Sequence, residues 1–119
     1  MFRMALAAAT MFVVCAGSAH AQDTDPASLD ARCAMIGLGI AGTEAATPEQ
    51  RSNGMVLAVY YIGRLQGRTP NIDLRAAFQR QAQTTPQDRL EGEGTRCTNE
   101  FRAVGQTLNA MNQAPAPTP

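Results

Sequence analysis

Residues 47–67 read TPEQRSNGMVLAVYYIGRLQG and include the most apolar segment of the chain beyond its first 21 residues. A helix begins here with a capping box, because the Thr47 side chain can accept from the N–H of Gln50 while the Gln50 side chain reaches back. Apolar residues recur at helical spacing on one face and then continue around the helix: Met55, Val59, Ile62 and Leu65, joined by Val56, Leu57, Tyr60 and Tyr61. A helix that is apolar on all sides is normally buried, so we expect this one at the centre of the fold.

Three further helices are indicated by capping and turn residues. Asp25-Pro26 begins the first helix, Asp73 caps the third, and Thr85-Pro86 precedes the fourth. Their inward positions recur at helical spacing: Leu29, Cys33, Ile36 and Ile40, then Leu74, Ala77 and Phe78, then Leu90, Gly94, Cys97, Phe101, Val104, Leu108 and Met111. We therefore expect an all-α fold, a small bundle of about four helices.

Glycines bear on where the second helix ends and on whether the fourth helix is continuous. Gly67 is the natural C-terminal cap of the second helix, and Pro70 prevents its continuation. Gly92 and Gly94 each cost about 1 kcal/mol inside a helix, which leaves open whether the fourth helix is continuous or restarts near Thr95.

The first 21 residues have the features of a cleavable secretory signal peptide. Arg3 precedes an apolar run over residues 4–16 that is too short to span a membrane, and Ala19 and Ala21 are placed for signal peptidase. Cleavage would leave a helical domain over residues 22–112 and a disordered Pro/Ala tail over residues 113–119. We expect a periplasmic or secreted protein that has no membrane contact once the signal is removed.

Two cysteines, Cys33 and Cys97, remain beyond the predicted signal peptide. An even pair in a small exported domain most often forms a disulfide. Closing the loop between them would stabilise the fold by about 4 kcal/mol. The sequence therefore predicts one disulfide that staples the first helix to the last.

Composition excludes several kinds of site. The chain has no Lys, and its single His lies inside the signal peptide, so a histidine-assisted nucleophile, a Schiff base and a histidine metal site are all missing. We expect no metal, no cofactor and no enzymatic activity. Nine Arg against ten acidic residues, scattered along the mature chain, also argue against nucleic-acid partners.

One catalytic alternative stays open. Asp88, Glu91 and Glu93 are close in sequence, and paired carboxylates can perform acid–base chemistry. Glu91 and Glu93 point to different sides of a helix, which suits solvation better than shared catalysis.

Residues 37–42 match the dinucleotide fingerprint G-x-G-x-x-G, which requires a strand before it and a helix directly after it. A capped helix precedes the glycines here and a loop follows, so close helix packing or a flexible helix end explains them better. Gly63 and Gly67 have G-x-x-x-G spacing, which in a soluble helix has no implication other than close helix packing.

The candidate ligand or partner surface is the group Tyr60, Tyr61 and Arg64. Two aromatic rings beside a guanidinium could line a groove, or they could be core aromatics whose hydroxyls reach the surface. Both interpretations stay open.

The order of elements resembles the small periplasmic proteins of the HdeA acid-stress chaperone type. The matching features are Cys33, the segment 59–67, the Asp73-Leu74 helix start and Cys97. The Lys-rich termini associated with client binding in that group are replaced here by a Pro/Ala tail. The resemblance implies an exported helical protein that acts by binding other periplasmic proteins, with a stress-related chaperone as one form. A periplasmic carrier of a small ligand is the alternative.

Overall fold

The computed structural model describes residues 24–113 and 115, and within them every regular element is a helix. In chain order these are α2 (Pro26–Gly42), α3 (Pro48–Arg68), α4 (Leu74–Thr84) and α5 (Gln87–Gln113). The predicted all-α bundle of four helices is confirmed. The predicted signal peptide over residues 1–21 lies outside the described residues, and so does the predicted tail apart from Gln113, which ends α5, and Pro115.

The predicted caps set the starts of three helices. Asp25 accepts from the backbone N–H of the third residue of α2, and Asp73 does the same for α4, both at 3.0 Å. At α3 the capping box is complete: Gln50 donates its N–H to Thr47 Oγ1 at 3.2 Å, and Thr47 donates its N–H to Gln50 Oε1 at 2.8 Å. Each cap satisfies orphan N–H groups of a first turn, which is why these short residue patterns locate helix starts.

The helix ends follow the sequence less closely. α3 continues one residue past Gly67 and is capped by Thr69, whose N–H donates to the carbonyl of Leu65. α5 is one helix through Gly92 and Gly94, and it does not restart near Thr95.

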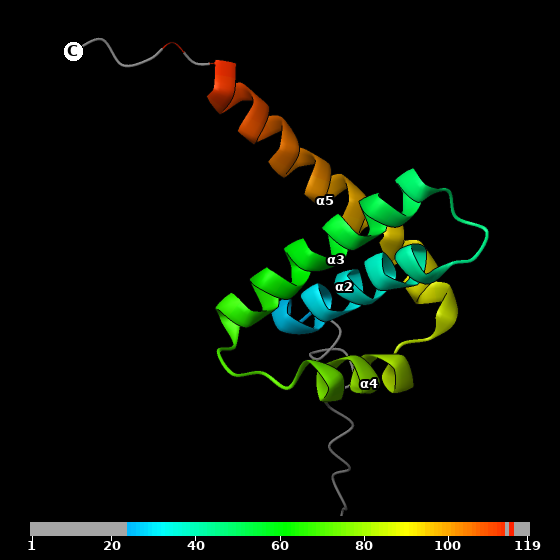
Figure 1. Cartoon of the computed structure of the whole chain (residues 1–119). Helices are drawn as coiled ribbons and strands as arrows, with labels where there is room; N and C mark the ends of the chain where they lie inside the picture. The colour runs from blue at the N-terminus through cyan, green and yellow to red at the C-terminus, as the bar shows by residue number, and fades with distance from the viewer. Residues whose placement is uncertain (1–23, 114, 116–119) are drawn as a thin grey trace, which may run out of the picture.

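The central helix is α2, which contacts all three other helices. Figure 1 shows α2 and α3 side by side and antiparallel, with α4 below α2 and α5 passing behind them. Five consecutive α2 residues, 30–34, are buried. The expectation that residues 47–67 form the central helix is wrong, because Met55 and Val59 are 49% and 61% exposed. The buried face of α3 is instead Gly54, Leu57, Ala58, Tyr61 and Leu65.

Glycine decides how closely α2 and α3 approach. A Cβ built on Gly37 would lie 2.6 Å from the backbone N of Ala58 and 2.7 Å from the carbonyl O of Gly54. A Cβ on Gly54 would lie 2.7 Å from the carbonyl O of Gly37. The first glycine of the G-x-G-x-x-G match therefore serves close helix packing, whereas Gly39 and Gly63 face open space.

We expect Gly54→Ala to destabilise the domain by about 1–3 kcal/mol, because the new methyl group meets backbone atoms that cannot rotate away. Gly63→Ala, on the same helix in open space, should instead stabilise by up to about 1 kcal/mol. Urea unfolding of both variants measures the difference. Equal effects would mean that the helix crossing is not tight.

The core is small and is organised around the disulfide. Cys33 of α2 and Cys97 of α5 are bonded, with their Cα atoms 5.5 Å apart, as predicted. Both cysteines are completely buried, together with Ala34 and Tyr61. Partly buried side chains close this cluster: Ile36, Tyr60, Ile62, Phe78 and Phe101.

Candidate functional site

The predicted surface residues Tyr60, Tyr61 and Arg64 do come together, but Tyr61 is buried and the other two are only partly exposed. The Tyr60 and Tyr61 rings are edge to face at 4.9 Å, and Arg64 Cζ lies 5.4 Å from the Tyr61 centroid and 5.6 Å from that of Tyr60. Tyr61 is fully buried, and its hydroxyl donates to the carbonyl of Cys97 at 2.8 Å. Tyr61 therefore cannot contribute to a ligand surface, because α5 covers it.

Arg64 is occupied by two carboxylates. Its guanidinium forms an ion pair with Asp30 at 3.2 Å and another with Glu100, and it donates to the Tyr60 hydroxyl. Burial lowers the pKa of Arg64, but the hydrogen bonds with Glu100 and Tyr60 and the charge of Asp30 raise it by more, so the net pKa lies above its ordinary value. These contacts connect α2, α3 and α5, so Arg64 stabilises the packing of the three helices.

Burial raises the pKa of Tyr61 to about 12, with the nearby Glu100 charge adding to the effect. The unfolded chain releases this proton near pH 10, so the native state loses stability as the pH rises from about 10 to 12. The full loss corresponds to roughly 3 kcal/mol. Urea unfolding at a series of alkaline pH values should show this decline in the wild type and in Tyr60→Phe. The decline should be shallower in Tyr61→Phe, and an equal slope in all three proteins would contradict the assignment.

The carboxylates considered for catalysis are separated by the fold. Glu93 turns inward, where its oxygens accept from Arg32 Nε at 2.9 Å, and Arg96 lies 3.4 Å away. Asp88 and Glu91 are exposed. Arg32 also donates to Gln81 Oε1 at 3.1 Å, so Glu93 belongs to a structural ion-pair network. Among the described residues no group of three or more His, Cys, Asp or Glu is placed to hold a metal ion.

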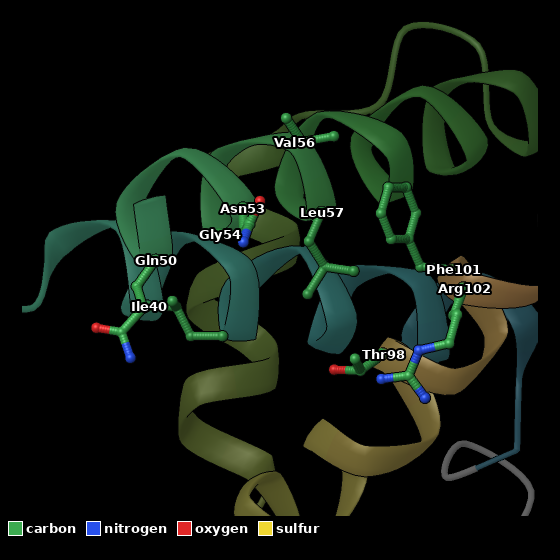
Figure 2. Close-up of a pocket in the computed structure, with 9 residues that line it drawn as sticks. All are labelled: Ile40, Gln50, Asn53, Gly54, Val56, Leu57, Thr98, Phe101 and Arg102. Carbon is green, nitrogen blue, oxygen red and sulfur yellow. The ribbon is translucent and has the colours of Figure 1, made fainter. Parts of the chain in front are cut away.

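A groove of about 580 Å³ lies where α2, α3 and α5 meet. Figure 2 shows Leu57 at its centre, Ile40 and Gln50 toward one end, and Phe101, Thr98 and Arg102 toward the other. Asn53, Gly54 and Val56 complete the lining. Apolar walls with a few polar groups are typical of binding grooves.

The groove borders an apolar strip on the outside of α3, formed by Met55, Val56 and Val59 and called the outer face below. These side chains are 49%, 51% and 61% exposed. The solvent side of a surface helix is normally polar, so this cluster of exposed apolar side chains is a candidate interaction surface. The outer face and the groove together are the candidate functional site.

Sequence reasoning missed this site, although its signal was present. The helix over residues 47–67 has more apolar positions than one buried face needs. These additional apolar positions led to the prediction that every side of the helix is buried. In the structure the bundle covers one side of α3 and leaves the outer face exposed.

No described helix is both long and apolar enough to span a bilayer. Comparisons of the chain with protein-family models, with curated proteins and with solved structures find no match.

Proposed function

We propose that this chain is an exported protein that binds apolar segments of other periplasmic proteins at the outer face of α3 and the adjoining groove. The observation that carries the proposal is the exposed apolar surface of Met55, Val56 and Val59 beside a groove of about 580 Å³. Exposed apolar patches on soluble proteins are often sites of protein–protein contact.

The compartment supports this function. The predicted signal peptide directs the chain out of the cytoplasm, and the disulfide between Cys33 and Cys97 suits an oxidising environment. The resemblance to acid-stress chaperones of the HdeA type favours the same class of activity. A stress-related chaperone that holds unfolding proteins is the specific form we propose.

The test is suppression of client aggregation by the purified, oxidised mature chain. An unrelated enzyme that aggregates on unfolding is mixed with it at a series of pH values between 7 and about 2, where carboxylates become protonated. We expect protection by the wild type and loss of protection in Val56→Arg/Val59→Arg, since Arg stays charged throughout this range. Absence of protection at every pH would refute the chaperone function.

A matched control distinguishes the loss of the apolar surface from the effect of added positive charge. Gly63→Arg/Gln66→Arg places the same two charges, at the same spacing, on exposed positions of α3 away from the groove lining, so it should protect as well as the wild type. If Gly63→Arg/Gln66→Arg loses as much protection as Val56→Arg/Val59→Arg, the outer face is not the binding surface.

The groove also favours a second candidate, a carrier of small amphipathic ligands. Arg102 lines the groove beside Phe101, and among the described residues its guanidinium hydrogen-bonds to Asn99 and forms no ion pair. A cation beside apolar walls suits a ligand with a carboxylate and an apolar body. Native mass spectrometry of protein from its own host should then show a co-purifying mass that Arg102→Met loses. A chain free of any bound mass would exclude the carrier function.

A further inference from the structure

The groove between α2, α3 and α5 is cationic at one end. Among the described residues that line it, Arg102 is the only charged one. Its guanidinium donates to Asn99 Oδ1 at 3.1 Å and forms no ion pair within the described part of the chain. A guanidinium has five N–H donors, so most of them remain available to bind a carboxylate at two points. The charge of the groove therefore matches an anionic ligand.

The position of Arg102 determines where the carboxylate sits in the ligand. Figure 2 shows Arg102 with Phe101 and Thr98 toward one end of the lining, beyond Leu57 at the centre. A carboxylate bound to Arg102 therefore lies at the end of the ligand, directly beside the apolar part that contacts the centre of the groove. The C-terminal residue of a polypeptide has this arrangement, because its carboxylate and its side chain are attached to the same carbon atom.

Amide side chains line the groove on the α3 side and favour a peptide over a fatty acid. Within the described residues, the Asn53 side chain has no hydrogen bond, and the Gln50 side chain has one, in which its Oε1 accepts from the N–H of Thr47 at 2.8 Å. A peptide backbone has a donor and an acceptor at nearly every residue, so it can pair with these amide groups. An alkyl chain would displace their water and replace none of its hydrogen bonds, which costs free energy.

The length of the groove suits a short stretch of peptide. Gln50 and Leu57 are about 10 Å apart along the axis of α3, at 1.5 Å per residue. An extended chain covers this distance with about three residues. The volume of about 580 Å³ falls within the range of small-ligand pockets.

We propose that the groove binds the C-terminal segment of a client protein, whose terminal carboxylate pairs with Arg102. The last apolar side chain of the client contacts Leu57 and Phe101, and its backbone runs past Asn53. This inference rests on the proposed function, the binding of apolar client segments, and adds which part of a client is recognised.

Peptide binding to the oxidised mature chain tests the role of the carboxylate. The probe is a fluorescent hexapeptide that ends in alanine, valine and phenylalanine, made once with a free C-terminal carboxylate and once with a C-terminal amide. Fluorescence anisotropy at pH 7 should show that the amide form binds about 10-fold more weakly, because it loses the charge-assisted hydrogen bonds. Equal affinity of the two forms would overturn the inference. Equally tight binding of an amidated peptide that ends in glutamate would also overturn it, since Arg102 would then accept any carboxylate.

Two variants assign the effect to one arginine. Arg102→Met should weaken binding of the free-acid peptide about 10-fold and leave the amide peptide unchanged. Arg75→Met changes an arginine of α4 outside the groove lining and should alter neither affinity. Both arginines are exposed, so circular dichroism should show intact helices in both variants. A free-acid peptide that binds Arg102→Met as tightly as the wild type would refute the assignment.

A fatty acid, decanoate, is the second probe, and Asn53→Leu distinguishes it from a peptide. This variant should bind the free-acid peptide about 2- to 10-fold more weakly, because backbone hydrogen bonds are lost, and its affinity for decanoate should not fall. Decanoate should compete only weakly with the peptide for the wild type. Tighter binding of decanoate than of the peptide would overturn the inference in favour of a small-ligand carrier.

Client protection distinguishes a failure of this inference from a failure of the proposed function. If both peptide forms bind equally and Val56→Arg/Val59→Arg loses protection, the groove binds apolar segments without recognising their C-terminus, and the proposed function stands. If the wild type binds neither peptide, the inference is refuted, and protection alone then decides the proposed function.

Discussion

Replacement of both Cys33 and Cys97 by Ser leaves most of the chain unfolded or degraded at growth temperature, and this is the largest effect we expect. The disulfide closes a separation of 64 residues. Such a constraint is worth about 4 kcal/mol, against a net stability that for small domains starts at about 5 kcal/mol.

The packing of α5 explains why this bond matters so much. Cys97 is the one described residue of α5 that is fully buried, so the disulfide is the main attachment of the helix to the core. Without it, α5 should separate from α2 and uncover Tyr61, whose hydroxyl bonds to the carbonyl of Cys97.

Thermal unfolding and limited proteolysis of Cys33→Ser/Cys97→Ser measure the loss. The variant Cys33→Ala/Cys97→Ala is the control, since it removes the bond without burying two hydroxyls, and it should be nearly as unstable. Mass analysis of the native chain should also show it two hydrogens lighter than the reduced form. Free thiols in the native chain, or full stability without the pair, would contradict this account.

Arg32→Met is expected to cost about 3–5 kcal/mol, the second large effect. The Arg32 side chain is 1% exposed and bonds to both oxygens of Glu93 at 2.9 Å and to Gln81 at 3.1 Å. Methionine keeps the length of the side chain but removes the charge. Glu93, 15% exposed, then loses its closest cation in a site where water cannot fully replace it.

Two further variants isolate the cause of the loss. Arg75→Met changes an exposed arginine of α4 in the same way and should alter the free energy of unfolding by less than about 0.5 kcal/mol. Arg32→Met/Glu93→Leu removes both charges and should recover much of the loss. Urea unfolding measures all three, and a double variant less stable than Arg32→Met would show that packing, not charge, is responsible.

The starts of α2, α3 and α4 were predictable from sequence because a cap is a local interaction. Asp25, Thr47 and Asp73 each bond to an N–H three residues away, so a short pattern contains the whole cause. The disulfide was predictable for a different reason, because only two cysteines remain beyond the predicted signal peptide.

The candidate site depends on contacts between residues far apart in the chain. The groove joins Ile40, Leu57 and Phe101 from three helices, and no local pattern places these helices against one another. Which side of α3 is buried follows from the contact between Gly37 and Gly54, where two backbones meet.

The chain's own sequence is therefore sufficient for the four helices, their starts and the bonded cysteines, since each follows from neighbouring residues or from simple counting. The central place of α2, the inward turn of Tyr61 and Glu93, the bare outer face of α3 and the projecting end of α5 arise only when the helices pack. Apolar periodicity shows that a face can be buried, but the available partners decide which face is covered, because burial requires a second surface of matching shape.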